Sequence, residues 1–153
     1  MREIDVTNES DGVSQLPEGL ADQLIAAARA AADHAYVPYS GFPVGAAVLT
    51  ASGEIISGVN IENASYGLTV CGERVAIQTA AARGHRELLA VAVSAPKATG
   101  TTPCGACRQV INEFKPSDRE MYVILDYFDS ISVVPFSQLL PDSFGPRDLE
   151  RAT

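Results

Sequence analysis

The sequence predicts an α/β protein with three layers (α/β/α), in which helices cover both faces of a mixed five-stranded sheet. Three segments with helical spacing of apolar residues alternate with five short apolar runs, in the order α, β, β, α, β, α, β, β. A strand-helix-strand crossover usually joins parallel neighbours, whereas a short turn joins antiparallel ones. Because the sequence contains both kinds of connection, we expect both kinds of strand pairing.

Three segments carry the helix pattern. In the first, apolar residues recur at helical spacing and the pattern stops before Pro38. The second is rich in Ala and closes on Gly84, and the third opens after Pro103 and is broken by Pro116. The predicted helices span residues 20–36, 71–84 and 104–114.

Five short apolar runs predict the strands. A Ser-Gly turn separates the first two, which predicts a hairpin, and a Phe-Asp-Ser turn separates the last two. The predicted strands span residues 44–50, 54–61, 87–95, 120–127 and 130–136. The connecting segments 60–70 and 96–103 are polar, and residues 139–149 form a tail rich in Pro and Gly.

Length and composition predict a single domain. The 153 residues are 46% hydrophobic and 20% charged, which is typical of globular proteins of about one domain. No stretch approaches the roughly 18 apolar residues of a membrane span. Residues 1–18 are polar and rich in turn-forming residues, so we expect a flexible N-terminal arm followed by one domain over residues 19–153.

The charge balance excludes some partners. Nineteen acidic residues against eleven basic ones give a net charge of −8, and only Lys97 and Lys115 are lysines. Long nucleic acids and anionic membrane surfaces are therefore not expected partners. Acidic residues stand where a secretory signal would carry its apolar stretch, so we expect a cytoplasmic protein.

The cysteines are Cys71, Cys104 and Cys107. An odd number without an export signal indicates metal binding or thiol chemistry and not a disulfide framework. Cys104 and Cys107 form a CxxC pair at a helix start, which by itself fits half a zinc site, a redox pair or coincidence. Cys71 also lies at a predicted helix start, where the positive end of the helix favours the thiolate form that binds zinc.

No fourth ligand is evident. His34 and His85 are the only histidines, and they lie at the ends of predicted helices, away from the cysteine-bearing termini. Three protein ligands with an open position are typical of catalytic zinc, whereas structural zinc sites usually have four.

Glu73 follows Cys71 by two residues, which in a regular helix would point the two side chains roughly 200° apart. We therefore expect Cys71 just before the helix or in its irregular first turn. A carboxylate there can take a proton from zinc-bound water and return it to a substrate. The alternative role is stabilisation of the helix dipole, although the nearby cysteines favour the catalytic one. Arg74 can offset the charge of three thiolates by bonding the sulfurs, or it can be an ordinary exposed arginine.

Together these motifs carry a family resemblance. The segment C-G-E-R at 71–74, followed by P-C-G-A-C-R-Q at 103–109, resembles the [HC]-x-E…P-C-x-x-C pattern of zinc nucleoside and nucleobase deaminases. In this class of enzymes the pattern goes with a common mechanism. Over roughly residues 20–149 the chain is similar to cytidine deaminases of the short, homotetrameric type with three cysteine ligands. The matching segments are YVPYSGFPVGAAVLT, GVNIENASYG, CGERVAIQ, PCGACRQVINEF and LLPDSFGPRDL.

The resemblance implies a zinc centre with one Zn²⁺ per chain and no organic cofactor. Its ligands would be Cys71, Cys104 and Cys107, with Glu73 as the proton shuttle and Arg74 bonded to the thiolates.

The resemblance also implies the substrate contacts. Asn60 and Glu62 would bind the ribose hydroxyls, Phe42 would line the pyrimidine pocket, and Phe144 would reach the pocket of a neighbouring subunit. Backbone groups around Gly72 would contact the base, although the family usually has Ala at this position.

The implied reaction is hydrolytic deamination of cytidine and deoxycytidine to uridine and deoxyuridine, with release of ammonia, as in pyrimidine salvage. Zinc-activated hydroxide would attack C4 while Glu73 protonates N3 and then the departing amine. A free nucleoside is expected as substrate, because the acidic chain offers few cations for a nucleotide, and a homotetramer is the implied assembly.

Three alternatives remain open at this point. Blasticidin S deaminase has the same zinc motifs, although the N-I-E-N segment and Phe42 favour cytidine. The cysteines could instead form a structural zinc module without catalysis, or a thiol redox switch.

Overall fold

The computed structural model describes residues 16–150. The elements in chain order are α1 (Leu20–Ala32), β1 (Gly45–Thr50), β2 (Ile55–Val59), the 3₁₀ turn η1 (Tyr66–Leu68), α2 (Gly72–Ala82), β3 (Leu88–Ser94), α3 (Gly105–Phe114), β4 (Tyr122–Asp126), β5 (Ile131–Pro135), α4 (Phe136–Leu139) and α5 (Pro146–Glu150).

The five strands form one sheet in the order β2-β1-β3-β4-β5. Strand β1 pairs antiparallel with both β2 and β3, and β4 pairs antiparallel with β5. Strands β3 and β4 are parallel, and α3 is the crossover between them. The prediction of a mixed five-stranded sheet that begins with a hairpin is confirmed.

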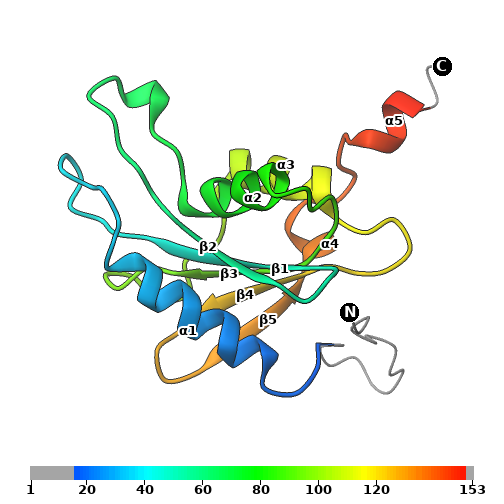
Figure 1. Ribbon diagram of the computed structural model, residues 1–153, viewed down its shortest axis with the longest axis horizontal. Coiled ribbons are helices and arrows are strands. Elements are labelled where there is room, and N and C mark those ends of the chain that lie inside the picture. Colours follow the sequence, from blue (N-terminus) through cyan, green and yellow to red (C-terminus); the bar gives the residue numbers. More distant parts are fainter. Residues whose placement is uncertain (1–15, 151–153) are drawn as a thin grey trace.

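Helices cover both faces of this sheet, with α1 on one side and α2 and α3 on the other (Figure 1). Successive side chains of β1 point to opposite faces of the sheet and belong to two separate apolar cores. Ala46 and Val48 pack with the α2 side, whereas Ala47 and Leu49 pack with the α1 side. The three-layer prediction is therefore confirmed, and the strands β1, β3 and β4 are buried along their whole length.

The first helix is shorter than predicted: α1 ends at Ala32, whereas the prediction ran to residue 36. Beyond it, the Tyr36 N–H donates to the Asn60 carbonyl at 3.0 Å, and Tyr36 forms a bridge with Ile61. The backbone of Tyr36 thus pairs with a distant segment and does not continue the helix.

No helix within residues 16–150 is long and apolar enough to cross a membrane.

The C-terminal tail is more regular than predicted. Helix α4 follows β5 directly, and α5 begins at Pro146 within the segment expected to be an irregular tail. Proline at the first position of a helix is favourable because its missing N–H has no helical partner to lose. The expected arm over residues 1–18 lies mostly outside the described residues, although Leu16 packs partly buried against the α1-side core.

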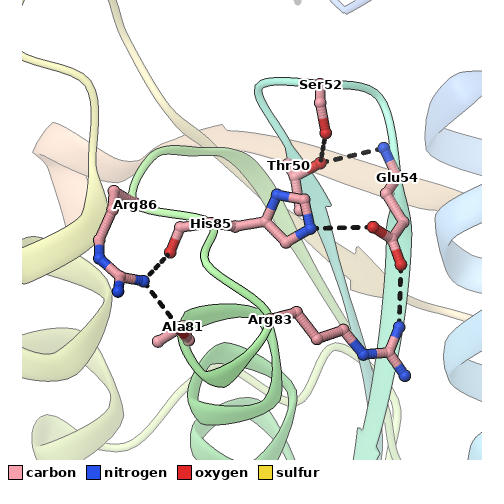
Figure 2. Close-up of polar contacts among 7 residues, drawn as sticks. All are labelled: Thr50, Ser52, Glu54, Ala81, Arg83, His85 and Arg86. Carbon is pink, nitrogen blue, oxygen red and sulfur yellow. Dashed lines mark hydrogen bonds and ion pairs between the residues drawn. The ribbon is translucent and has the colours of Figure 1, made fainter.

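The hairpin turn between β1 and β2 is fastened to the C-terminal end of α2 (Figure 2). The Glu54 carboxylate accepts a hydrogen bond from Arg83 Nη1 at 2.8 Å and lies 2.8 Å from His85 Nε2. The Thr50 hydroxyl accepts the Glu54 N–H at 3.0 Å. These contacts fix the end of α2 opposite to Cys71.

Candidate metal centre and active site

The N-termini of α2 and α3 meet on the same face of the sheet and bring the three cysteines together. Cys71 and Cys104 each stand immediately before their helix with extended backbone, at ψ 153° and 170°. Cys107 lies in the first turn of α3. The three Sγ atoms lie within 4.8 Å of one another, with 3.8 Å between Cys71 and Cys104 and 3.5 Å between Cys104 and Cys107.

The extended backbone of Cys71 affects how its side chain lies relative to Glu73. Because Cys71 precedes the helix instead of belonging to it, its side chain does not follow the helical rotation that would separate it from Glu73. The Glu73 side chain is buried, at 4% exposure. Burial raises its pKa and the charge of Cys71 raises it further, while hydrogen bonds from its own backbone and Cys107 and the charge of Arg74 oppose the shift.

Arg74 lies against the sulfurs. Its Nη2 atom is 3.6 Å from Cys71 Sγ and 3.4 Å from the Thr69 carbonyl oxygen, while its buried Nε has no partner among the described residues. Hydrogen bonding with Cys107, then with Arg74 and Cys104, lowers the pKa of Cys71 to about 5 against the opposing effect of burial. The pKa of Cys107 is raised by its contact with Cys71, by burial and by the charge of Glu73.

This donor set fits zinc. Thiolates are soft ligands that select zinc among the common divalent cations, and both helix N-termini favour negative charge at the sulfurs. In residues 16–150 the cluster contains no other His, Cys, Asp or Glu. His34 lines a groove beside α1 and β2, and His85 contacts Glu54, so the two histidines belong to other parts of the fold. Three ligands leave one coordination position for chemistry.

The two residues expected at the ribose hold the loop that carries Phe42. Asn60 Oδ1 accepts the Val44 N–H and Nδ2 donates to the Phe42 carbonyl, both at 2.9 Å. The Glu62 carboxylate accepts the N–H groups of Tyr39 and Ser40 at 2.9 and 3.1 Å and the Ser40 hydroxyl. Sequence reasoning missed this second role, because contacts between segments about 20 residues apart leave no local pattern.

An open cavity of about 380 Å³ adjoins this loop. It is lined by Tyr39, Ser40, Glu62, Tyr66 and Thr69. The rings of Tyr39 and Tyr66 meet edge to face with centroids 5.8 Å apart. The Thr69 carbonyl also accepts a hydrogen bond from Arg74, which contacts Cys71. The cavity therefore borders the cysteine cluster at residue 69. Phe42 is half-buried on the loop that forms this side.

Gly72 lies where the N-terminus of α2 approaches the sheet. A Cβ at this position would lie 3.2 Å from the Val44 carbonyl oxygen and 3.4 Å from the Asn60 nitrogen. The alanine that is usual in the family would thus be tight here, and its neighbours would have to move by a few tenths of an ångström.

Phe144 is attached to α3 through its backbone while its side chain is 63% exposed. Gln109 Nε2 and Asn112 Nδ2 both donate to its carbonyl at 3.0 Å. Sequence reasoning did not single out either polar residue. Their spacing of three places both on one face of α3, which is the local signal that marks them as a pair.

Comparison with known proteins agrees with this geometry. Residues 20–124 match the model of the cytidine and deoxycytidylate deaminase zinc-binding region. The chain belongs to this family. Within this deaminase family, the cytidine deaminase of Halalkalibacterium halodurans is 47% identical over 126 residues, which covers 82% of this chain and 95% of the relative. The cytidine deaminase of Mycobacterium tuberculosis is 41% identical over 121 residues, which covers 79% and 86%.

A solved deaminase structure has the same fold. The crystal structure of cytidine deaminase from Burkholderia pseudomallei superposes with a TM-score of 0.74 at 44% identity and covers 80% of this chain and 98% of that one. The chain is thus a zinc-dependent deaminase with its three cysteines positioned to bind the ion.

Proposed function

We propose that this deaminase hydrolyses cytidine and deoxycytidine to uridine and deoxyuridine, with release of ammonia, in pyrimidine salvage. The observation that carries the proposal is the meeting of three thiols with the buried carboxyl of Glu73 at two helix N-termini. Relatives that match more than three quarters of the chain are cytidine deaminases, which supports the choice of substrate.

Glu73 moves the protons in this reaction. Zinc held by Cys71, Cys104 and Cys107 supplies, when bound, a nucleophile at neutral pH. Glu73 accepts the proton that water loses as its oxygen adds to C4, and it donates that proton to N3. Glu73 then carries the proton of the new C4 hydroxyl to the N4 amine, so the C4–N4 bond breaks, the C4 carbonyl forms and ammonia leaves. The burial of Glu73 shields its carboxyl from bulk water during these transfers.

Other residues hold the nucleoside and complete the site. Phe42 lines the pyrimidine pocket, backbone groups at Gly72 contact the base, and Asn60 and Glu62 bind the ribose while they order the Phe42 loop. Arg74 offsets the negative charge of the thiolates. Phe144 closes the pocket of a neighbouring copy in a homotetramer, which its exposed side chain on an anchored backbone supports. The three unpaired thiols suit the reducing cytoplasm, where we place the protein.

A single substitution tests the proposal. Glu73→Gln keeps the size of the side chain but cannot accept a proton, so kcat for cytidine should fall by at least about 100-fold. The loss of cytidine is followed by its ultraviolet absorbance change, and zinc is measured at one per chain in both proteins. The exposed Glu113→Gln variant on α3 should keep the wild-type rate.

Three results would contradict this proposal. Equal rates for the wild type and Glu73→Gln would remove Glu73 from the mechanism. No turnover of cytidine by the zinc-loaded wild type would remove the function, and faster turnover of blasticidin S than of cytidine would reassign the substrate.

A further inference from the structure

Asn112 on α3 is a buried amide with both of its ends bonded to the C-terminal segment. Its side chain is 2% exposed. Oδ1 accepts the Ser143 hydroxyl at 3.1 Å, and Nδ2 donates to the Phe144 carbonyl at 3.0 Å. Gln109, three residues earlier, donates to the same carbonyl. Two consecutive residues of the segment are thereby fixed on one face of α3.

The chain after Phe144 is fixed as well. A Cβ at Gly145 would lie 2.5 Å from Asn112 Nδ2, so the close approach to Asn112 depends on glycine. The Gly145 N–H donates to Asp148 Oδ2 at 2.7 Å, and the Asp148 N–H donates to the Gly145 carbonyl at 2.9 Å. The segment then enters α5, which projects from the body of the molecule (Figure 1).

The side chain of Phe144 is exposed, although two hydrogen bonds from α3 hold its backbone carbonyl. A large apolar ring on an ordered backbone has little conformational entropy left to lose when it enters a partner. Aromatic side chains of this kind contribute strongly to contacts because they bury a large area with few rotatable bonds. The anchored segment therefore has the properties of an element that contacts another molecule.

We propose that Asn112 is a positioning residue that presents Phe144 to the nucleoside site of a second copy of this chain. The inference rests on the proposed function, in which Phe144 closes the pocket of a neighbour. Asn112 acts through the backbone of residues 143–145 and does not itself contact the substrate. Its loss should therefore weaken nucleoside binding and leave the proton transfers of Glu73 intact.

Asn112→Asp is the sharpest variant. It keeps the size and the acceptor for Ser143, but it places an acceptor against the Phe144 carbonyl, so that contact becomes repulsive. We expect KM for cytidine to rise about 10-fold, with kcat within about twofold of the wild type, since the loss of one hydrogen bond to a positioning carbonyl is a change of this order. Zinc per chain should not change.

Further variants separate positioning from a general loss of stability. Asn112→Asp combined with Phe144→Ala should have the KM of Phe144→Ala alone, because an effect that passes through Phe144 cannot add to its removal. Thr50→Val removes a buried hydroxyl contact in the turn between β1 and β2 (Figure 2) and should lower the melting temperature without changing KM. If Asn112→Asp does not fold, Gly145→Ala displaces the same segment and should raise KM in its place.

Mixed oligomers test the transfer between copies. Chains with Asn112→Asp are co-assembled with chains that carry Glu73→Gln, each with its own affinity tag. An active site with an intact Glu73 whose neighbour is a Glu73→Gln chain then receives Phe144 from a chain with an intact Asn112, so the KM of these sites should return to the wild-type value. If Asn112 acts on the site of its own chain, the KM of these sites stays raised.

The outcomes are distinguishable. An unchanged KM in Asn112→Asp, additive effects in the double variant, or no recovery in the mixed oligomers would overturn the positioning role while the wild type still deaminates cytidine. A wild type that does not turn over cytidine overturns the proposed function, and this inference with it.

Discussion

Glu62 is nearly buried, and its carboxylate accepts two backbone N–H groups and one hydroxyl from residues 39 and 40. The Ser40 hydroxyl, and then these backbone groups, lower the pKa of Glu62 against the opposing effect of burial. Asn60 holds the next two positions of the same loop through Phe42 and Val44. At the scale of single residues, the side chains assigned to the ribose also order the loop that carries Phe42.

Glu62→Gln tests this double role without substrate. The glutamine amide replaces one acceptor oxygen by an NH₂ group, which is a donor and faces the donors of Tyr39 and Ser40. The loop that carries Phe42 should therefore lose part of its order. Hydrogen exchange of the Tyr39 and Ser40 amides should become faster in the ligand-free protein, and KM for cytidine should rise more than kcat falls. The same exchange rates are expected in the wild type and in Glu113→Gln. Unchanged exchange in Glu62→Gln would limit Glu62 to a substrate contact.

The spacing between elements depends on two glycines. A Cβ at Gly45 in β1 would lie 1.9 Å from the Ala28 carbonyl of α1, and one at Gly58 in β2 would lie 2.3 Å from the Ala76 nitrogen of α2. Each helix therefore contacts the sheet backbone directly, on opposite faces. The approach at Gly58 also sets the position of the N-terminus of α2, where Cys71 and Glu73 lie.

Gly58→Ala should therefore affect both the fold and the metal centre. Pushing α2 from the sheet is overpacking, which should lower the free energy of unfolding by about 2 to 3 kcal/mol. The displacement of Cys71 should also weaken zinc retention during titration with a chelator. Gly67→Ala is the control, since nothing lies within 4 Å of its added methyl. Equal stability of the two variants in urea would show that α2 adapts without cost.

At the scale of the whole molecule, an ion pair between the partly exposed Arg29 of α1 and the buried Asp126 of the sheet joins two layers. The Asp126 carboxylate at the end of β4 is 1% exposed and accepts Arg29 Nε and Nη2 of α1 at 2.7 and 2.6 Å. Ser94 at the end of β3 donates a third hydrogen bond at 2.7 Å, and the Phe128 N–H donates a fourth at 2.8 Å. Arg29, then Ser94 and Phe128, lower the pKa of Asp126 to about 2 despite burial.

This pair predicts an acid-sensitive stability. Since the folded pKa lies below the usual value, the stabilisation is complete above about pH 5 and is lost as the pH falls towards 2. Asp126→Asn should lower the free energy of unfolding by about 2 kcal/mol at pH 7, with a difference from the wild type that shrinks below about pH 4. Urea unfolding at several pH values measures this difference.

The exposed Asp118→Asn variant is the control, and it should show little change at any pH. A difference between the wild type and Asp126→Asn that stays constant from pH 7 to 3 would show that the charge of Asp126 contributes little.

Local patterns were sufficient for the elements of the fold and for the position of the cysteines at two helix starts. Alternation and helical spacing place the five strands and the three main helices to within a few residues, with the end of α1 as the largest error. The expectation that Cys71 lies just before its helix or in the first turn follows from its spacing of two residues to Glu73. These features depend on neighbours within about one helical turn, so the chain order contains them.

Contacts between segments far apart in the chain could not be predicted in this way. Three sets of contacts join residues that are between 16 and 97 positions apart in the chain. They are the hydrogen bonds of Asn112 to residues 143–145, the loop held by Asn60 and Glu62, and the ion pair of Arg29 with Asp126. An asparagine or a glycine looks the same in sequence whether it faces solvent or a distant backbone. Its partner is known only when packing brings the two segments within hydrogen-bonding distance, because burial then makes an unpaired polar group costly.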